Sequence, residues 1–223
     1  MPKRKRHRGQ PRALPVGMAV RDDGARTLEV GGVTQSVEVP QQGEAPEGYW
    51  RLMLPPECPR CALLLGLGGG TIAHLLARRC PDAEMVGVDS DETVLALALQ
   101  EFGLETLTHL CIEVADALAW VAEHSGSEPG AYDLICLDLF QGGRLAAGTL
   151  ATAFLRQLAA LLAPDGTLAV NLMVTGRTPE QLHRLRRVFA IVREQRVRGN
   201  LVVHAHALPK AEIGLPPLAE EDC

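Results

Sequence analysis

Apolar runs alternate with stretches of helical spacing over most of the chain. Short runs of strand length occur at residues 62–67, 84–89, 108–116, 132–140 and 167–174. The spacing of apolar residues between and after these runs predicts helices over 71–80, 91–103, 117–124, 149–166 and 178–189. We expect the fourth helix to end at Pro164 and Gly166, and the fifth to open with a Thr178 cap and Pro179. Strand–helix alternation of this kind implies a parallel sheet.

The two ends of the chain depart from this alternation. Two strand-like runs, 189–197 and 201–208, are joined by a tight turn with no helix between them, so they must pair antiparallel. Near the start, residues 13–54 look like a small β unit in which Gly31-Gly32 marks a two-residue turn. A dinucleotide dehydrogenase would normally keep alternating. Five parallel strands finished by a β-hairpin indicate instead the sheet of enzymes that use S-adenosylmethionine.

These observations predict an α/β protein with a Rossmann-like class I methyltransferase fold, a mostly parallel sheet ending in an antiparallel hairpin. We divide the chain into a disordered basic arm at 1–12, an N-terminal β segment at 13–56, a methyltransferase-like domain at 57–210 and a C-terminal tail at 211–223. The length of 223 residues suits one such domain, and a hydrophobic content of 47% is enough for a full core.

Composition indicates where the protein works. Glycine interrupts the apolar runs well before the roughly 20 residues of a membrane span, and no apolar signal-peptide core follows the basic start. We therefore expect a cytoplasmic protein without a membrane partner. The six cysteines fit a reducing compartment, with Cys111 and Cys136 as small hydrophobes inside strands. The Cys58–Cys61 spacing resembles a zinc or redox pair, but no second pair follows, so we expect no metal site.

Charge is concentrated at the N-terminus. Residues 1–12 hold six Lys/Arg and no acid, so removing this +6 from the net −5 leaves −11 for the remainder. Such an arm could touch RNA, anionic lipid or a targeting receptor, but we favour a solvated terminus and regard nucleic acid as a partner only through this arm. The arginines at 193, 196 and 198 read as a solvated basic face.

A glycine-rich turn stands between the first buried strand and its helix. Gly66, Gly68, Gly69 and Gly70 allow a tight turn and a close backbone approach to a ligand at the helix N-terminus. Alone this is a weak signal, because any tight strand–helix turn can use glycine.

Two aspartates strengthen the signal. Asp89 ends the second strand 19 residues after Gly70, where a carboxylate can accept both ribose hydroxyls, and Asp116 ends the third strand, within reach of an adenine edge. The alternative is that both are helix N-caps. Taken together the set favours an adenosyl ligand. NAD fits the terminal hairpin poorly, and the lack of a lysine-containing phosphate loop disfavours ATP.

These motifs in this order make the chain similar to the spermidine/spermine synthase family, the polyamine aminopropyltransferases. The resemblance covers roughly residues 20–208, from TLEVGGVTQSVEV through GYWRLML, LLLGLGGG, VGVDSDE, VADALAWV and YDLICLD to GNLVVHAHA. It implies a nucleoside pocket, a catalytic aspartate, substrate-contacting residues and, from likeness alone, a homodimer. The nucleoside residues would be Gly66, Gly68, Gly70, Asp89, Asp116 and Ala117, the catalytic residue Asp138, and the substrate residues Gln35, Tyr49 and Gln141.

Three departures from the family pattern remove acceptor-binding acids. Thr71 stands where the glycine motif continues into aspartate, Gln141 replaces the second carboxylate of the D-x-x-D loop, and Arg51 replaces the acid after Tyr49. A diamine carries two ammonium groups that need carboxylate partners, so putrescine should bind poorly. If Arg51 lies near the acceptor, an anionic or neutral small molecule becomes plausible.

We therefore expect S-adenosylmethionine, or its decarboxylated form, as the cofactor and methyl transfer to a small acceptor as the reaction. Asp138 could be a general base, a carboxylate near the sulfonium, or a loop cap. The alternatives are an aminopropyltransferase with an unusual acceptor and a non-catalytic protein that binds the nucleoside or a partner. His204 and His206 share one strand face, but no third metal ligand is evident.

Overall fold

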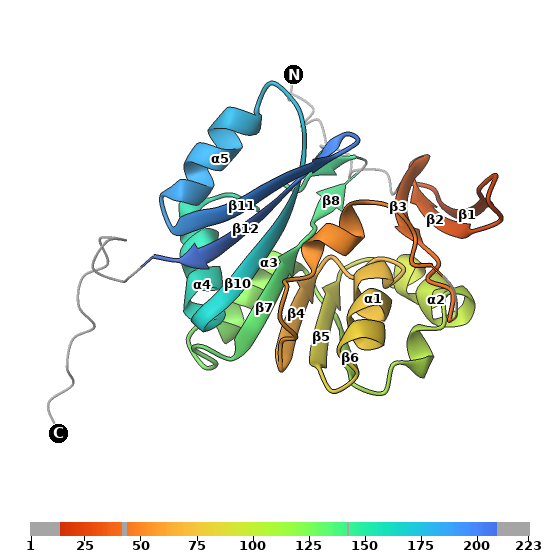
Figure 1. The fold of residues 1–223 in the computed structure, drawn as a ribbon, viewed down its shortest axis with the longest axis horizontal. Coiled ribbons are helices and arrows are strands. Elements are labelled where there is room, and N and C mark those ends of the chain that lie inside the picture. Colours follow the sequence, from red (N-terminus) through yellow and green to blue (C-terminus); the bar gives the residue numbers. More distant parts are fainter. Residues whose placement is uncertain (1–13, 42–43, 142, 209–223) are drawn as a thin grey trace, which may run out of the picture.

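A seven-stranded sheet forms the centre of the protein (Figure 1). The computed structural model describes residues 14–41, 44–141 and 143–208. The strands lie in the order β11-β12-β10-β7-β4-β5-β6, and β12 runs antiparallel to both β10 and β11 while the other pairs are parallel. Their bounds are Cys61–Leu65 (β4), Glu84–Asp89 (β5), Leu110–Val114 (β6), Tyr132–Leu137 (β7), Leu162–Met173 (β10), Phe189–Val197 (β11) and Asn200–Ala207 (β12). The predicted α/β class with its terminal hairpin is confirmed.

Helices cover both faces of this sheet because its central strands are apolar on both sides. In β4, Leu63 and Leu65 belong to one core cluster and Ala62 and Leu64 to the other. The first cluster contains residues of α3 (Ala117–His124), α4 (Thr152–Leu161) and α5 (Thr178–Arg186). The second contains residues of α1 (Thr71–Arg79), α2 (Glu92–Glu101) and the short 3₁₀ helix η1 (Tyr49–Met53). Another short 3₁₀ helix, η2, spans Leu104–Thr106.

The N-terminal β unit is a separate three-stranded antiparallel sheet of β1 (Val16–Val20), β2 (Arg26–Val30) and β3 (Val33–Val37). Its β2–β3 turn contains Gly31 and Gly32, both with positive φ, as the two-residue turn signal predicts. Buried Leu28 of β2 clusters with Val94 and Phe102 around α2. The unit therefore packs against α2, above which it lies in Figure 1.

Two expected helix boundaries are wrong. The fourth helix ends at Leu161 and the chain passes at once into β10, which includes Pro164 and Gly166. Position 166 favours glycine, because a Cβ there would lie 2.9 Å from the Ala163 carbonyl oxygen and 3.0 Å from that of Tyr132. Thr178 is the first residue of α5 rather than its cap, and its hydroxyl accepts a hydrogen bond from the Thr175 N–H. The small hairpin of β8 (Phe140–Gln141) and β9 (Arg144–Leu145) was not predicted.

The expectation that all cysteines are reduced is also wrong. Cys58 and Cys80 form a disulfide that joins the segment before β4 to the C-terminal end of α1. The pairing partner of Cys58 is thus 22 residues away and not the neighbouring Cys61, which remains a thiol. Cys136 is a buried thiol, whereas Cys111 is exposed rather than packed as a small hydrophobe.

The predicted basic arm at 1–12 and the tail at 211–223 lie outside the described residues. None of the helices in the described ranges has the length and apolar run that a bilayer span requires.

Candidate active site

The glycine turn after β4 is shaped by close backbone approaches. Gly66, Gly68 and Gly70 all have positive φ, which L side chains rarely adopt. A Cβ on Gly66 would lie 2.4 Å from the carbonyl oxygen of Asp138, so the ends of β4 and β7 can meet only with glycine here. Gly70 is the N-cap of α1, and a Cβ there would run into Leu104. Of the three predicted glycines, Gly66 and Gly68 line the cavity, while Gly70 is not among the lining residues.

Asp89, at the end of β5, faces this turn. Its Oδ2 accepts a hydrogen bond from the Gly68 N–H at 2.9 Å, and its Oδ1 accepts one from the Asp91 N–H at 3.1 Å. Burial raises the pKa of Asp89, and the two N–H donors oppose that rise. Because Asp91 is the N-cap of α2, Asp89 is not a helix cap but a carboxylate held at the cavity wall.

Asp116 is both a helix cap and a residue of the cavity wall. It is the N-cap of α3, where its Oδ1 accepts the Ala119 N–H at 3.0 Å, and it also lines the cavity together with Ala117. A capping aspartate has lone pairs left over on its carboxylate, so the cap does not prevent contact with a ligand.

Asp138 follows β7 and carries two side-chain hydrogen bonds. The Tyr49 hydroxyl donates to its Oδ2 at 2.8 Å, and Nδ2 of Asn171 donates to its Oδ1 at 2.8 Å. Burial raises the pKa of Asp138 to about 6, although both donors favour the charged form and lower it. Tyr49 itself is held in the phenol form, because burial and the Asp138 charge raise its pKa well above the usual value. The arrangement gives a carboxyl group that can exchange a proton near neutral pH.

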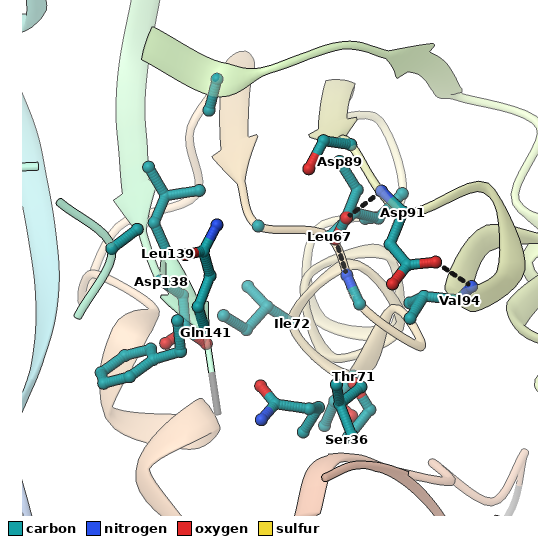
Figure 2. A pocket seen from close by; sticks show the side chains of 18 of the residues that line it. Ser36, Leu67, Thr71, Ile72, Asp89, Asp91, Val94, Asp138, Leu139 and Gln141 are labelled. Carbon is teal, nitrogen blue, oxygen red and sulfur yellow. Dashed lines mark hydrogen bonds between the residues drawn. The ribbon is translucent and has the colours of Figure 1, made fainter. Parts of the chain in front are cut away.

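These groups surround one cavity of about 490 Å³, within the range of small-ligand sites. Figure 2 shows Asp138 and Gln141 on one side of it and Asp89 and Asp91 on the other, with Ser36 and Thr71 between the β3 side and the glycine turn. Trp50 and Phe140 line the cavity without filling it. Predicted residues on its wall are Gln35, Gly66, Gly68, Asp89, Asp116, Ala117, Asp138 and Gln141. Tyr49 lies behind Asp138, outside the lining.

Hydrogen bonds of the Thr71 and Ser36 side chains hold the N-terminal sheet against the glycine turn. The Thr71 hydroxyl accepts from the Val37 N–H at 2.9 Å and donates to the Val37 carbonyl at 2.8 Å. The Ser36 hydroxyl accepts from the Gly69 N–H at 2.8 Å. Both residues are buried, at 2% exposure each. The residue that replaces the family aspartate is therefore occupied with holding β3 in place.

The charge around the cavity differs from expectation. Arg51 is exposed and does not line it, so the predicted arginine beside an acceptor is wrong. Among the described lining residues there are four carboxylates, from Asp89, Asp91, Asp116 and Asp138, and no lysine, arginine or histidine. Such a wall favours neutral or cationic ligands over anions.

The histidines on β12 are used structurally. His204 shares a hydrogen bond with the Leu52 carbonyl at 2.7 Å, and His206 with the Gly166 carbonyl at 3.0 Å. Within the described ranges no group of three His, Cys, Asp or Glu residues is placed to hold a metal ion.

Sequence reasoning did not single out Asn171, which contacts Asp138 directly. A signal existed: an amide at the centre of the apolar run TLAVNLMV must be buried with a partner. Trp50, Ser36, Asp91 and Phe140 were likewise not predicted as lining residues, since only the tertiary structure brings their segments together.

Comparison with known proteins agrees with this geometry. Residues 62–212 match the family model described as "Methyltransferase domain". The chain belongs to the methyltransferase domain family. It has the Rossmann-like methyltransferase fold, and the match includes the turn, Asp89, Asp116 and Asp138.

Curated relatives include both methyl- and aminopropyltransferases. The chain is 25% identical over 174 residues to the mouse (Mus musculus) eEF1A lysine and N-terminal methyltransferase, covering 74% of this chain and 25% of that protein. It is 36% identical over 137 residues to trans-aconitate 2-methyltransferase of Methylobacterium radiotolerans, covering 61% and 46%. It is 29% identical over 119 residues to the polyamine aminopropyltransferase of Vibrio vulnificus, covering 53% and 40%. The chain thus spans from a quarter to under half of these relatives.

Solved structures share the fold. Human methyltransferase-like protein 13 in complex with SAH has a TM-score of 0.60 and 24% identity, over 70% of this chain and 77% of that one. A probable spermidine synthase from Corynebacterium glutamicum has a TM-score of 0.69 and 18% identity, over 86% and 76%. The spermidine synthase likeness is therefore confirmed at the level of fold, within a broader methyltransferase family.

Family membership implies S-adenosylmethionine as the cofactor, and the residues present fit it. The Asp89 carboxylate suits ribose hydroxyls, Asp116 suits an exocyclic amine, and the apolar side chains of Ile72 and Leu118 suit a purine ring. The positive φ of Gly66 and Gly68 turns the backbone toward the cavity.

Proposed function

We propose that this protein is an S-adenosylmethionine-dependent methyltransferase that acts on a small acceptor, with Asp138 as the catalytic carboxylate. The observation that carries the proposal is the position of Asp138 on the cavity wall, held from behind by Tyr49 and Asn171. The open cavity between Asp138 and Asp89 favours a working enzyme over a non-catalytic protein, because the Trp50 and Phe140 side chains leave the space free.

When bound, S-adenosylmethionine supplies a methyl group on a cationic sulfur. Asp89, Asp116 and the glycine turn would hold the cofactor, which would offer its methyl carbon to a lone pair of the acceptor while its sulfur kept the electron pair of the broken carbon–sulfur bond. The acceptor loses a proton, and Asp138 in its carboxylate form is placed to take it. Positioning supplies most of the acceleration in a displacement of this kind.

The acceptor is proposed to be neutral or cationic. Burying an anion among Asp89, Asp91 and Asp138 would cost free energy that no described lining cation offsets. This replaces the anionic acceptor that the sequence position of Arg51 had suggested. Gln35 and Gln141, whose amides both donate and accept hydrogen bonds, are the proposed acceptor contacts.

Aminopropyl transfer from the decarboxylated cofactor is the second candidate, and the acidic wall of the cavity favours it. The aminopropyltransferase relative and the spermidine synthase fold are consistent with it. Thr71 disfavours aminopropyl transfer, because its hydroxyl is already hydrogen-bonded to the backbone N–H and carbonyl of Val37. The methyl donor therefore remains the first choice.

Calorimetric titration separates the candidates. The ligands are S-adenosylmethionine, its decarboxylated form, methylthioadenosine and NAD, measured in parallel on the full chain. Tighter binding of S-adenosylmethionine than of the decarboxylated form supports methyl transfer, and the reverse order supports aminopropyl transfer. An Asp89→Asn variant is expected to lose at least about tenfold in affinity for every adenosyl ligand, as expected for one charge-assisted hydrogen bond. If none of the four ligands binds, the proposed function is wrong.

The homodimer, the cytoplasmic location and a solvated basic arm remain predictions from sequence, with RNA binding by that arm as the alternative. Binding of RNA by the arm would weaken steeply with salt and would be lost on deleting residues 1–12.

A further inference from the structure

We propose that Asn171 and Asn200 form an amide relay that positions Asp138 and keeps it in its ionised form. The proposal rests on the proposed function for the reactive role of Asp138. The relay itself concerns the ligand-free protein and can be tested without a cofactor.

The relay is a chain of two hydrogen bonds. Nδ2 of Asn200 donates to Oδ1 of Asn171 at 2.9 Å, and Nδ2 of Asn171 donates to Oδ1 of Asp138 at 2.8 Å. Asn200 also lies 3.5 Å from the Met173 sulfur, a weak acceptor. The cavity wall is thereby connected to the start of β12, a strand outside the cavity lining.

Strand register explains how the three residues meet. On the antiparallel pair β10–β12, Asn171 is opposite Val202 and Met173 is opposite Asn200. Because side chains alternate along a strand, Asn171, Met173, Asn200 and Val202 lie on one face of the sheet. Asn171 and Asn200 are therefore diagonal neighbours, within reach of each other.

Burial gives the relay its direction. Asn171 is 1% exposed, so its amide cannot exchange these partners for water. An amide has one acceptor end and one donor end. Because Asn200 donates to Oδ1 of Asn171, the NH₂ group of Asn171 faces Asp138. The relay therefore presents a donor to the carboxylate.

The other titratable groups that face Asp138 act through different atoms from the relay. Tyr49 on η1 donates to the second carboxylate oxygen, and Cys136 on β7 is a buried thiol whose pKa is raised by burial and by the Asp138 charge. Neither group acts on Oδ1 of Asp138, which is bonded to Asn171.

An Asn200→Asp substitution tests the relay because it reverses the polarity at the far end. A carboxylate at 200 only accepts, so the Asn171 amide must turn its NH₂ toward residue 200 and its oxygen toward Asp138. Asp138 can then satisfy that oxygen only by holding a proton. We expect its titration midpoint to rise by at least about one pH unit, a tenfold change in proton affinity. Asn200→Ala, which leaves Asn171 free to turn, should raise it less.

The readout is the ¹³C carboxyl shift of Asp138 against pH in the ligand-free protein, assigned by its absence in Asp138→Asn. Through-space repulsion from the new charge is separated by repeating the Asn200→Asp change in an Asn171→Leu background. The relay predicts a large shift with Asn171 present and a small one without it. Equal shifts in both backgrounds would overturn the proposal.

A second control covers the case in which Asn171→Leu does not fold. Gln195 on β11 pairs with Val202 on β12, and Val202 pairs with Asn171 on β10. A Gln195→Glu substitution therefore places a charge two strands away from Asn171, at roughly 10 Å. The relay predicts a shift from Asn200→Asp well above that from Gln195→Glu. Comparable shifts would contradict it. If the relay titrates as expected but no transfer is found, only the proposed function fails.

Discussion

At the scale of single residues, the environment of Asp138 decides the chemistry. Desolvation works against its charge, while Tyr49 and Asn171 each donate a hydrogen bond that supports it. The balance leaves a pKa of about 6, so the group is largely ionised at neutral pH and still basic enough to take a proton.

This balance predicts the pH dependence of the reaction. A base works only when deprotonated, so the transfer rate should rise with pH, about tenfold per unit well below pH 6, and level off above it. Tyr49→Phe removes a donor that lowers the Asp138 pKa, so the midpoint should move upward. Initial rates against pH check both, and Asp138→Asn should lose about 10²- to 10⁴-fold at the plateau. A flat profile in the wild type would exclude Asp138 as the base.

At the scale of elements, the site exists because the ends of parallel strands meet there. Gly66 lets β4 approach the backbone that follows β7, and Thr71 and Ser36 fasten β3 above the glycine turn. The N-terminal sheet is therefore part of the cavity, since Gln35 and Ser36 of β3 line it.

Gly66→Ala should be strongly destabilising. The added Cβ would lie 2.4 Å from the Asp138 carbonyl oxygen, and φ is +89°. We expect a loss of roughly 1–3 kcal/mol or more in the free energy of unfolding, measured by urea denaturation. Gly126→Ala is the matched control, because nothing lies within 4 Å of a Cβ there. Similar losses in the two variants would argue against the close approach as the cause.

Thr71→Val should weaken the docking of β3. The substitution keeps the shape but leaves the N–H and carbonyl of Val37 without their hydroxyl partner, at a cost of about 2–4 kcal/mol for two buried groups. Denaturant titration measures the loss, and Thr71→Ser, which keeps the hydroxyl, should retain most of the stability. If Thr71→Val has the same unfolding free energy as the wild type, the Thr71 hydrogen bonds contribute nothing to stability.

At the scale of the whole molecule, a disulfide joins two parts that carry the site. Cys58 follows the segment that bears Tyr49 and Trp50, and Cys80 caps the end of α1, whose other end is the glycine turn. A 22-residue separation constrains the unfolded chain more than the folded one.

Removing this disulfide should lower stability without changing the cavity residues. The Cys58→Ser/Cys80→Ser variant is expected to lose about 3 kcal/mol in unfolding free energy, from the loop-closure entropy of a loop of this length. Thermal unfolding with and without reductant measures it, with Cys111→Ser, at an exposed free thiol, as the control. Reductant should lower the wild-type melting temperature but not that of the double variant. An unchanged wild-type transition would contradict a stabilising disulfide.

The sequence by itself determined the order of strands and helices, the class of fold and the strand-end aspartates. These follow from local patterns: apolar runs mark buried strands, amphipathic spacing marks helices, and glycine and aspartate after a strand mark ligand-binding turns. The terminal hairpin also follows from a local pattern, since it requires only two adjacent strand-like runs and a turn. It distinguished this sheet from that of a dehydrogenase.

Tertiary structure alone decided contacts between residues far apart in the chain. The Asp138 pKa depends on Tyr49, 89 positions away, and on Asn171, 33 positions away. The disulfide depends on where α1 ends, and the cavity charge depends on Arg51 pointing outward while Trp50 points in. Such contacts are fixed by how whole elements pack against each other, and hydrogen bonding and desolvation act through those distances rather than through sequence spacing.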